Sequence, residues 1–442
     1  MRTYADLHIH SKYARACSPQ LTPENIDLWG RIKGVGLIAT GDFTHPKWFE
    51  ELKEKLEPAE PGLYRLKKQY HRTDPRFKPQ QEVDVRFIFG TEVACIYKHK
   101  DAVRRVHHCL YLPSLESVAK FNAQLIARGR NLKADGRPIL GLSSQDLLKI
   151  LLAVDERGVL IPAHAWTPWF AIFGSKSGYD SIAECFDDLS RHIFAIETGL
   201  SSDPPMNWRL SQLDDVALVS HSDAHSLPNL GREVDIFAGE GLSYEAVMQA
   251  IRCGSPRAVA AGEDKKLSLK LAGTVEFFPD EGRYHYDGHR DCKVRLEPGA
   301  TAKHKGICPT CGRELTIGVL NRVYELADRV EGVRPKGALP FVSLIELDKV
   351  IAQAQGVKGR TTKAVEAEYW GLVSQGGGEL QTLLDTAETD LSQVTTERVV
   401  EAIRRLRQGL VASIEPGYDG VYGSINLFSA EEKPAKRQTS LF

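Results

Sequence analysis

Short apolar segments alternate with amphipathic segments up to about residue 262, and this alternation predicts repeated strand–helix units. The strand candidates are TYADLHI, GVGLIAT, VRFIFGTEVACIY, HHCLYLP, GVLIPAHA, IFAIETG and VALVSHSD. The helix candidates have clear ends, because Thr22 is an N-cap before Pro23, and a second helix begins at Ser114 and stops at Gly129. The pattern favours a parallel α/β fold, and a barrel over an open sheet.

The pattern changes after residue 262. A β-like, turn-rich stretch reaches about residue 318, and helical patterns then dominate to about residue 410. We therefore predict four parts, which are a barrel over 1–262, a small metal-binding module over 263–318, a helical region over 319–428 and a flexible tail over 429–442.

The composition is that of a globular protein, with 442 residues, 42% hydrophobic and 26% charged. The net charge of −1 means that any nucleic-acid binding must come from local patches. No apolar run approaches the roughly 18 residues of a membrane span, and the first strand leaves no room for a signal peptide. Eight cysteines with one close pair, CPTC, indicate a reducing cytoplasm and a metal site.

Potential metal ligands recur around the ends of the predicted strands. They are Asp6, His8, His10, Asp42, His45, Glu92, His107, His108, His164, Glu197, His221, Asp223 and His225. A lone histidine there is more often structural, but six strands with such groups indicate a multinuclear metal site at one end of a barrel. Mixed His and carboxylate ligands suit zinc or manganese, and Asp42, Glu92 or Asp223 can bridge ions. Ions about 3.5–4 Å apart would clamp a phosphate ester and activate a water.

A second ligand pattern predicts a zinc site in the module. His289 and Cys292 stand in GHRDC, and Cys308 and Cys311 follow in CPTCG after 15 intervening residues. Four protein ligands leave no open position, so we expect a structural zinc ion. His285 is the rival to His289, and unpaired core thiols are the alternative.

The segments DLHIHS, GDFTHP, GTEV, AHAW and SDAH resemble the motif series of the PHP superfamily of metal-dependent phosphoesterases. The resemblance implies a distorted (β/α)7 barrel with three metal ions. It assigns metal and catalytic roles to His8, His10, Asp42, Glu92, His108, His164, Asp223 and His225. Phe43 stands where the superfamily usually has a histidine, and His45 is the substitute. His108 matches the strand histidine better than His107, and Glu197 and His221 are either ligands or partners that orient ligands.

The barrel motifs, the zinc module and PGYDGVYG together resemble the endonuclease Q family, from Met1 to about Phe428. The resemblance implies a DNA repair endonuclease that acts on uracil, hypoxanthine, xanthine and abasic sites. It would cut the phosphodiester 5′ of the lesion and leave a 3′ hydroxyl and a 5′ phosphate. Magnesium or manganese would support turnover, and we expect the zinc module and the helical region to hold the DNA.

Aromatic residues follow the strand histidine at 164 and suggest a pocket for a flipped base. The expected substrate contacts are Trp166, Trp169, Phe170, Ser175, Lys176, Ser177, Tyr418 and Tyr422, with Phe173 beside them. The alternative is a barrel loop whose aromatic side chains pack on the next helix.

The final residues, KRQTSLF, resemble the peptide that bacterial repair proteins insert into the DNA sliding clamp. Gln438, Leu441 and Phe442 would be its anchors. We therefore predict a cytoplasmic, nucleoid-associated endonuclease with damaged DNA and the clamp as partners and no membrane contact. The rival functions are a small-molecule phosphoesterase of the same superfamily and a non-catalytic, clamp-tethered sensor of DNA damage.

Overall fold

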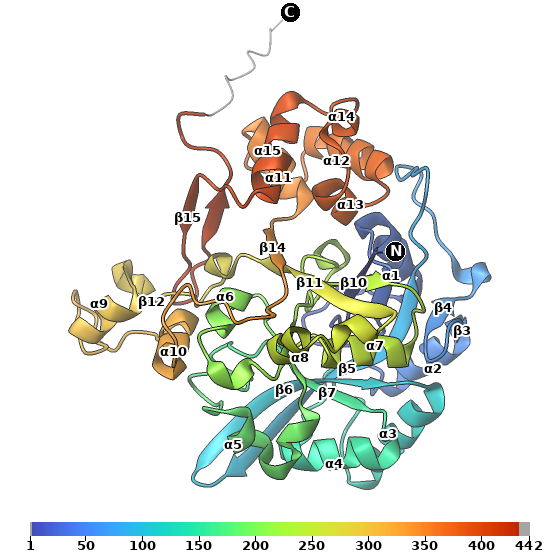
Figure 1. The fold of residues 1–442 in the computed structure, drawn as a ribbon, viewed down its shortest axis with the longest axis vertical. Coiled ribbons are helices and arrows are strands. Elements are labelled where there is room, and N and C mark those ends of the chain that lie inside the picture. Colours follow the sequence, from blue (N-terminus) through green and yellow to red (C-terminus); the bar gives the residue numbers. More distant parts are fainter. Residues whose placement is uncertain (1, 433–442) are drawn as a thin grey trace, which may run out of the picture.

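A mixed sheet of ten strands forms the centre of the molecule in a computed structural model that describes residues 2–432 (Figure 1). Its strands are β1 (Arg2–Asp6), β2 (Leu37–Ala39), β3 (Leu56–Pro58), β4 (Tyr64–Leu66), β5 (Arg86–His99), β6 (Ala102–Leu112), β7 (Val159–Pro162), β10 (Val234–Gly239), β11 (Leu269–Phe277) and β14 (Phe341–Leu344). A separate parallel pair consists of β8 (Ala195–Glu197) and β9 (Ala217–Val219).

Helices surround these strands. In the first part of the chain they are α1 (Pro23–Lys33), α2 (Pro46–Lys55), α3 (Leu115–Ala127), α4 (Ser144–Val154), α5 (Ile182–Phe186), α6 (Pro204–Asn207), α7 (Tyr244–Arg252) and α8 (Pro256–Ala261). The predicted helix signals are confirmed, since the Thr22 side chain accepts a hydrogen bond from the N–H of Asn25, and Ser114 accepts one from the N–H of Ser117. Gly34 ends α1 with a φ of 80°, which suits glycine.

Seven strands form a closed ring, so the predicted barrel is confirmed. β1, β2 and β5 pair in parallel, and β5, β6 and β7 pair in antiparallel fashion. The N–H of Ala165 donates to the carbonyl of Glu197 over 2.9 Å and joins the ends of β7 and β8. A parallel bridge between Ile9 and Ala224 then joins the end of β9 to the continuation of β1.

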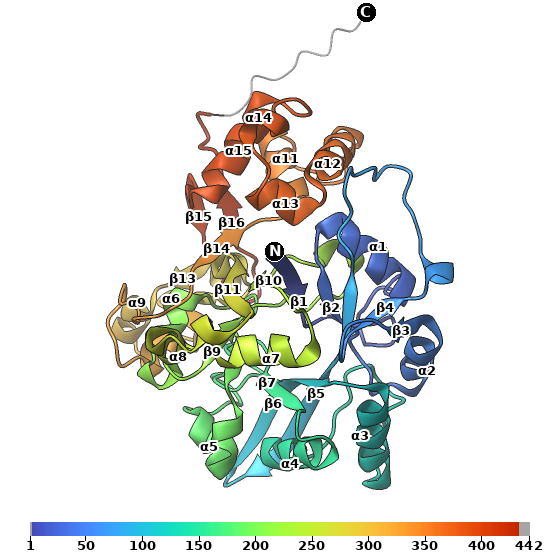
Figure 2. The same ribbon diagram turned by 45° about the vertical axis from the view of Figure 1, so that its right-hand side comes forward.

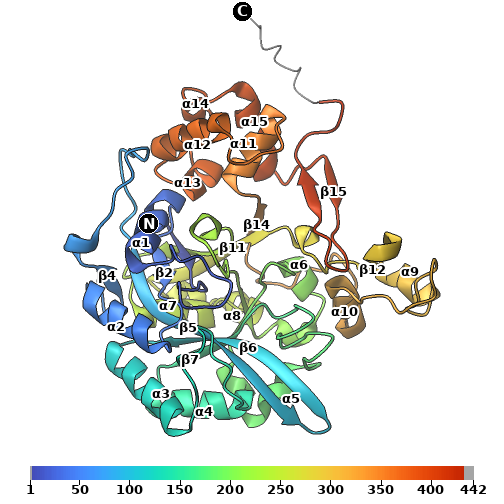
Figure 3. The same cartoon turned by 180° about the vertical axis from the view of Figure 1, so that it is seen from behind.

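The expectation of parallel strands throughout is wrong at β5 and β6. Only Lys100 and Asp101 separate these two strands, so they form a hairpin, seen at the lower right of Figure 3. Lys100 has a φ of 53°, the left-handed conformation that usually indicates glycine or asparagine. The turn KHKDA contains neither residue, and its sequence therefore gave no hairpin signal.

Residues beyond 262 extend the sheet and add two smaller parts. β11 pairs with β10, and β14 pairs in parallel with β11. The module to one side of the barrel contains β12 (Asp287–His289), β13 (Val294–Leu296), α9 (Pro298–Lys303) and α10 (Val319–Leu326). The part above the sheet in Figure 2 contains α11 (Leu347–Gln355), α12 (Lys363–Gly376), α13 (Glu379–Leu384), α14 (Glu388–Leu391), α15 (Glu397–Arg407), β15 (Ser413–Glu415) and β16 (Ser424–Asn426).

A buried ion pair fixes α13 to α1. Lys33 Nζ lies 2.7 Å from Glu379 Oε2, and both side chains are almost completely buried. Glu379 also accepts hydrogen bonds from the Tyr369 hydroxyl and the N–H of Leu347. The carboxylate is therefore fully paired, which a buried charge requires. No helix within residues 2–432 is long and apolar enough to cross a membrane.

We predict that Lys33→Met destabilises the protein by roughly 3–5 kcal/mol, because the Glu379 carboxylate loses its cation while it remains buried. Urea unfolding would measure this change. Lys120→Met removes the exposed partner of Glu116 on α3 and is the matched control, which we expect to change stability little. Equal effects of the two substitutions would contradict the importance of the buried pair.

Candidate metal centre

Four side chains from three strands or the residues that follow them meet at one point inside the ring. His8 and His10 follow β1, Glu92 lies on β5 and Asp223 follows β9. His10 Nε2 lies 3.2 Å from Glu92 Oε2 and 3.1 Å from Asp223 Oδ1. His8 Nε2 lies 3.6 Å from each of the same two oxygens. The alternation of DLHIHS therefore does place both histidines toward one group, as predicted.

Three of these atoms fit a metal ion. His8 Nε2, His10 Nε2 and Asp223 Oδ1 are buried and have no hydrogen-bond partner among the described residues. A buried polar atom without a partner costs about 1–3 kcal/mol, and such atoms are rarely left together. Two imidazole nitrogens and two carboxylate oxygens within 4.8 Å of one another match the donors that bind zinc or manganese.

A second ligand group shares Glu92 with the first. Glu92 Oε1 lies 2.6 Å from His107 Nδ1 and 3.0 Å from His164 Nε2. The two histidine nitrogens are 3.3 Å apart. The two oxygens of Glu92 thus face two different ligand groups, and this carboxylate has the position of a bridge between two ions.

The second group contains His107 and not the predicted His108. Neighbouring residues on a strand point to opposite faces, and only His107 points toward Glu92. His108 Nε2 lies 2.8 Å from the Ser144 hydroxyl of α4, and its ring packs near Phe186. Burial lowers the pKa of His108 to about 3, so this histidine is neutral. The apolar residues after His108 suggested the wrong strand register, because both faces of β6 are buried here.

Two carboxylates hold the histidines of the first group in place. Glu197 lies 3.0 Å from His8 Nδ1 and accepts a hydrogen bond of 2.7 Å from the N–H of His164. Asp42 Oδ1 lies 3.0 Å from His10 Nδ1, and Asp42 Oδ2 accepts from the N–H and the hydroxyl of Ser11. In both cases Nδ1–H of the histidine can donate to the carboxylate, which leaves Nε2 free to bind a metal.

His221 supports Glu197 in turn. Its Nδ1 lies 2.9 Å from Glu197 Oε1, and its Nε2 lies 3.1 Å from Asp235 Oδ2. Burial lowers the pKa of His221, but Asp235 and Glu197 outweigh burial and raise it to about 10. Glu197 and His221 therefore orient ligands, which is one of the two roles expected for them. Asp6 accepts from the N–H groups of Ser222 and Gly231 and fixes the Asp223 loop.

Asp42, His45 and His225 lie at the edge of the centre. Asp42 contacts His10 but is not in either ligand group. His45 directly precedes α2, and its ring stacks on the ring of Tyr13 with 4.3 Å between the ring centres. It therefore does not join the ligand groups in place of the histidine that the superfamily usually has at the position of Phe43. The ring of His225 lies 4.7 Å from the ring of His10, and its Nδ1 lies 2.9 Å from the Asp223 carbonyl.

Three residues of the centre have left-handed backbone conformations. The φ angles are 45° for Asp42, 28° for His164 and 46° for Asp223. A residue other than glycine in this region costs about 1–3 kcal/mol, and such strain concentrates at functional sites. The surrounding ring keeps these residues in the conformations that point their side chains inward.

Arg137 is a site residue that the sequence did not reveal. Its Nη1 donates to Glu92 Oε2 over 2.9 Å, and a quarter of its side chain is exposed. The guanidinium therefore reaches both the buried ligands and the solvent. Arg137 stands in a loop segment, ADGRPIL, without strand or helix periodicity, so no sequence signal identified it.

The predicted aromatic residues after His164 divide into two classes. Trp166 and Phe173 are completely buried with rings 4.9 Å apart, and Trp166 Nε1 donates to Asn207, so Trp166 belongs to the core and cannot stack on a base. Trp169 is 39% exposed, and the Phe170 ring lies 4.6 Å from the ring of His107. Phe170 therefore borders the metal centre, and Trp169 is its exposed neighbour in the chain.

The predicted polar residues of the same loop also differ from one another. Lys176 is exposed. Ser177 is buried and its hydroxyl donates to the carbonyl of Arg105, so it is not free to contact a base. The hydroxyl of the half-buried Ser175 has no partner among residues 2–432. Arg322 of α10 fixes the loop by donating to the carbonyls of Phe173 and Tyr179.

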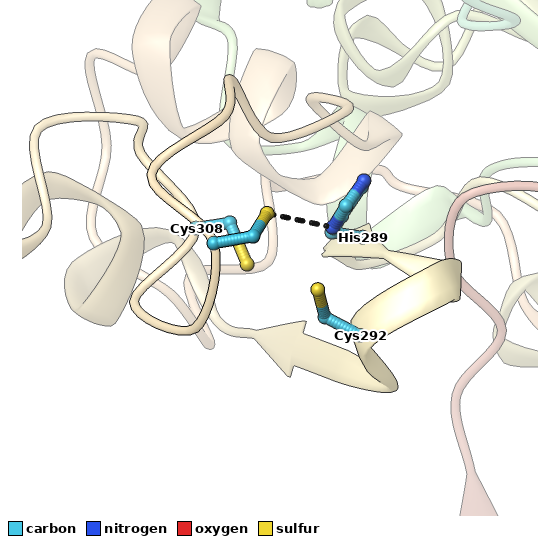
Figure 4. A group of neighbouring side chains, drawn as sticks. His289, Cys292 and Cys308 are labelled. Carbon is cyan, nitrogen blue, oxygen red and sulfur yellow. Dashed lines mark hydrogen bonds between the residues drawn. The ribbon is translucent and has the colours of Figure 1, made fainter.

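The predicted zinc ligands converge in the module (Figure 4). His289, Cys292, Cys308 and Cys311 offer ligand atoms that all lie within 4.8 Å of one another, and Cys311 Sγ lies 3.4 Å from His289 Nδ1. Burial raises the pKa of the Cys308 thiol, but the N–H groups of Cys311 and Thr310 lower it to about 6. His285 instead lies 3.5 Å from Asp280, so His289 is the histidine of this group.

Tyr418 and Tyr422 lie beside this module. The backbone of Tyr418 forms a bridge with Tyr286, and its ring packs over Gly288. Tyr422 is 70% exposed, with the Arg283 guanidinium 4.7 Å from its ring. Of the two predicted tyrosines, Tyr422 is therefore the one with a large free surface.

Two curated relatives and one family model match the chain. The model described as the MJ0043 C-terminal domain matches residues 346–410. "Uncharacterized protein MJ0043" of Methanocaldococcus jannaschii is 31% identical over 271 residues, which are 60% of this chain and 31% of that protein. "Uncharacterized protein YqxK" of Bacillus subtilis is 27% identical over 435 residues, which are 96% of this chain and 99% of that protein. The chain thus aligns with about a third of the Methanocaldococcus relative and nearly all of the Bacillus relative.

Two solved structures match almost the whole chain. The lesion-specific endonuclease PfuEndoQ of Pyrococcus furiosus has a TM-score of 0.82 and 29% identity, with 99% of this chain and 98% of that chain covered. Endonuclease Q in complex with a 27-mer duplex that has an abasic lesion at the active site has a TM-score of 0.80 and 29% identity, with 99% of each chain covered.

The ring and the shared Glu92 define a mixed α/β protein with a multi-ligand metal centre inside a seven-stranded barrel. Within that class, the chain is similar to endonuclease Q over almost its whole length, the family that its motifs resemble.

We predict that His107→Ala lowers the metal content of the barrel by about one ion per chain, because one of the two ligand groups loses a donor. His108→Ala changes the neighbouring residue on the opposite face and should leave the metal content unchanged. Elemental analysis of both folded variants would measure this, with the module's zinc as an internal reference. Metal loss in His108→Ala alone would contradict the observed register.

Proposed function

We propose that this protein is a DNA repair endonuclease that hydrolyses the phosphodiester 5′ of a damaged nucleotide. The proposal rests on the Glu92 carboxylate between two possible metal-ligand groups, with the Phe170 ring 4.6 Å from the ring of His107 in the second group. The match to endonuclease Q with an abasic duplex over 99% of both chains supports DNA as the substrate. We extend the proposal to uracil, hypoxanthine and xanthine, which the family resemblance implies.

The ligand groups would hold zinc or manganese in the barrel, with magnesium or manganese as alternatives during turnover. Bound divalent ions would supply a water nucleophile at neutral pH and stabilise the charge that develops on the phosphate. His8, His10, Glu92 and Asp223 would hold one ion, and Glu92, His107 and His164 a neighbouring one. In the reaction the water oxygen bonds to phosphorus, the bond to the 3′ oxygen breaks and that oxygen takes up a proton.

Arg137 would bind a non-bridging phosphate oxygen during the reaction. Its guanidinium already lies against Glu92 and is partly exposed, so it can contact a phosphate without moving far. Arginine presents paired N–H donors that match phosphate oxygens. Glu197 and Asp42 keep His8 and His10 oriented throughout.

The damaged base would leave the duplex and contact the loop after His164. Trp169 and Phe170 offer aromatic faces near the metal centre, and Lys176 and Ser175 offer polar groups. Removing a base from the stack costs least when it is already mispaired or missing, which favours damaged sites. Tyr418 and Tyr422 would contribute to DNA binding farther away.

The zinc site of the module would have a structural role. His289, Cys292, Cys308 and Cys311 complete a tetrahedral ligand set, so no position remains for a substrate. We propose three functional parts, a barrel over 1–262, a zinc module over 263–318 and a helical DNA-binding region over 319–428, with β11 of the second part joined to the central sheet.

We expect a single incision 5′ of the lesion in a duplex that contains one abasic analogue, uracil or hypoxanthine. Asp223→Asn should reduce the rate by about a hundredfold or more, because the first ligand group loses a charged donor. End-labelled duplexes with manganese or magnesium would measure this, and an undamaged duplex is the control. Turnover of a simple phosphate ester without any DNA incision would instead favour a small-molecule phosphoesterase. Lesion binding without incision would favour a non-catalytic sensor.

We also propose that the C-terminal peptide binds the DNA sliding clamp and brings the enzyme to the nucleoid. Its anchors Gln438, Leu441 and Phe442 lie outside the described residues, and the sequence pattern alone supports this proposal. Deleting residues 438–442 should abolish clamp binding in a pull-down and leave incision of a short duplex intact. Clamp binding by the deletion variant would contradict the assignment.

A further inference from the structure

Five side chains from three distant segments are linked one to the next, by ring contacts or as neighbours in the chain, from the ligand residue His107 to Tyr422. We name this set the aromatic–cation strip, and it consists of Phe170, Trp169, Tyr284, Arg283 and Tyr422. The Phe170 ring lies 4.6 Å from the ring of the ligand His107, the Trp169 ring lies 5.6 Å from the ring of Tyr284, and the Arg283 guanidinium lies 4.7 Å from the ring of Tyr422.

The strip has free surface that the fold does not use. Tyr422 is 70% exposed and Trp169 is 39% exposed, whereas the core aromatic residues Trp166 and Phe173 of the same loop are completely buried. Single exposed aromatic residues are common, but a row assembled from three segments is typical of a binding surface.

Backbone contacts hold the strip in a fixed shape beside the zinc module. The N–H of Gly420 donates to the carbonyl of Arg283 over 2.9 Å, and the N–H of Val319 donates to the carbonyl of Tyr284 over 2.7 Å. Asp419 accepts from the N–H of Arg290 and from the hydroxyl of Thr316, which fixes the turn before Tyr422. The aromatic faces are therefore arranged before any ligand arrives.

The charge beside the strip suits a phosphate backbone. Arg283 and Arg290 are exposed, and the Arg290 guanidinium and the Tyr284 hydroxyl both lie next to Gly420. The whole chain has a net charge of −1, so this positive character is local. Aromatic faces with arginines beside them are the combination that binds single-stranded nucleic acid without reading its sequence.

We propose that the unpaired nucleotides flanking the lesion lie along the strip and stack on Trp169, Tyr284 and Tyr422, while Arg283 and Arg290 contact their phosphates. This inference rests on the proposed function and adds a path for the DNA strand from the metal centre to the zinc module. A small phosphate ester would be too short to reach beyond Trp169.

Single-turnover incision of a duplex with one abasic site tests the strip in the full-length protein. Tyr284→Ala and Arg283→Ala should each raise the enzyme concentration for half-maximal rate by about fivefold or more, because stacking or a phosphate contact is lost. This increase should be larger than any change in the rate at which the same variants hydrolyse bis(p-nitrophenyl) phosphate, because this small ester does not reach the strip. Tyr284→Phe keeps the aromatic face and should restore binding. Zinc content of each variant would show that the module is folded.

The matched control is Tyr324→Ala. Tyr324 is 59% exposed, with an arginine, Arg209, 5.1 Å from its ring, but it is not part of the strip. For Tyr324→Ala we expect the enzyme concentration that gives half of the maximal incision rate to stay within about twofold of the wild-type value.

Fluorescence of 2-aminopurine, placed on either side of the lesion, reports stacking directly. The wild type should change this fluorescence at one flank, and Tyr284→Ala should abolish the change. A second outcome is that the wild type incises damaged DNA while Tyr284→Ala and Arg283→Ala give the same half-maximal enzyme concentration and the same fluorescence change as the wild type. That result would contradict DNA binding along the strip and leave the proposed function intact. If the wild type incises no DNA, both are wrong.

Discussion

The buried carboxylate of Glu92 is the group on which the whole centre depends. It is completely buried, and a buried carboxylate is costly unless cations surround it. Burial raises the pKa of Glu92, but Arg137, His107 and His8 outweigh burial and hold it well below its usual range. Burial likewise lowers the pKa of His10, while Asp42, Asp223 and Glu92 raise it well above its usual range. The surrounding groups thus supply positive charge that metal ions can replace, and metal binding at such a site releases protons.

The barrel provides the geometry that this charge requires. Seven strands close into a ring, with Glu92 and His107 inside β5 and β6 and the other ligand residues just after β1, β7 and β9, so the donors converge from several directions. The left-handed conformations of His164 and Asp223 would be unfavourable in a free loop. The neighbouring contacts, such as Glu197 with the N–H of His164 and Asp6 with the N–H of Ser222, hold these residues in place. Fold stability and metal binding are therefore linked at the same residues.

Much of this arrangement could be predicted from the sequence, because it depends on local patterns. Alternation in DLHIHS placed His8 and His10 on one face, and the spacing of GHRDC and CPTCG indicated the four residues that the structure brings together as a possible metal site, with His289 rather than His285 among them. Other features depend on tertiary packing. The sequence could not show which of His107 and His108 points toward Glu92, because β6 is buried on both faces and the apolar pattern therefore does not reveal which face is which. The burial of Trp166 could not be predicted, because it depends on a contact with Asn207, which is distant in the sequence. The position of Arg137 could not be predicted either, because it depends on a loop that approaches Glu92.

We propose that Glu92 bridges two metal ions inside the barrel. Anomalous X-ray diffraction at the metal absorption edge of crystals grown with manganese or zinc would test it most directly. We expect two anomalous peaks about 3.5–4 Å apart on either side of the Glu92 carboxylate, one near His8, His10 and Asp223 and one near His107 and His164. A single peak away from Glu92, or a metal ion bound by His108, would contradict it.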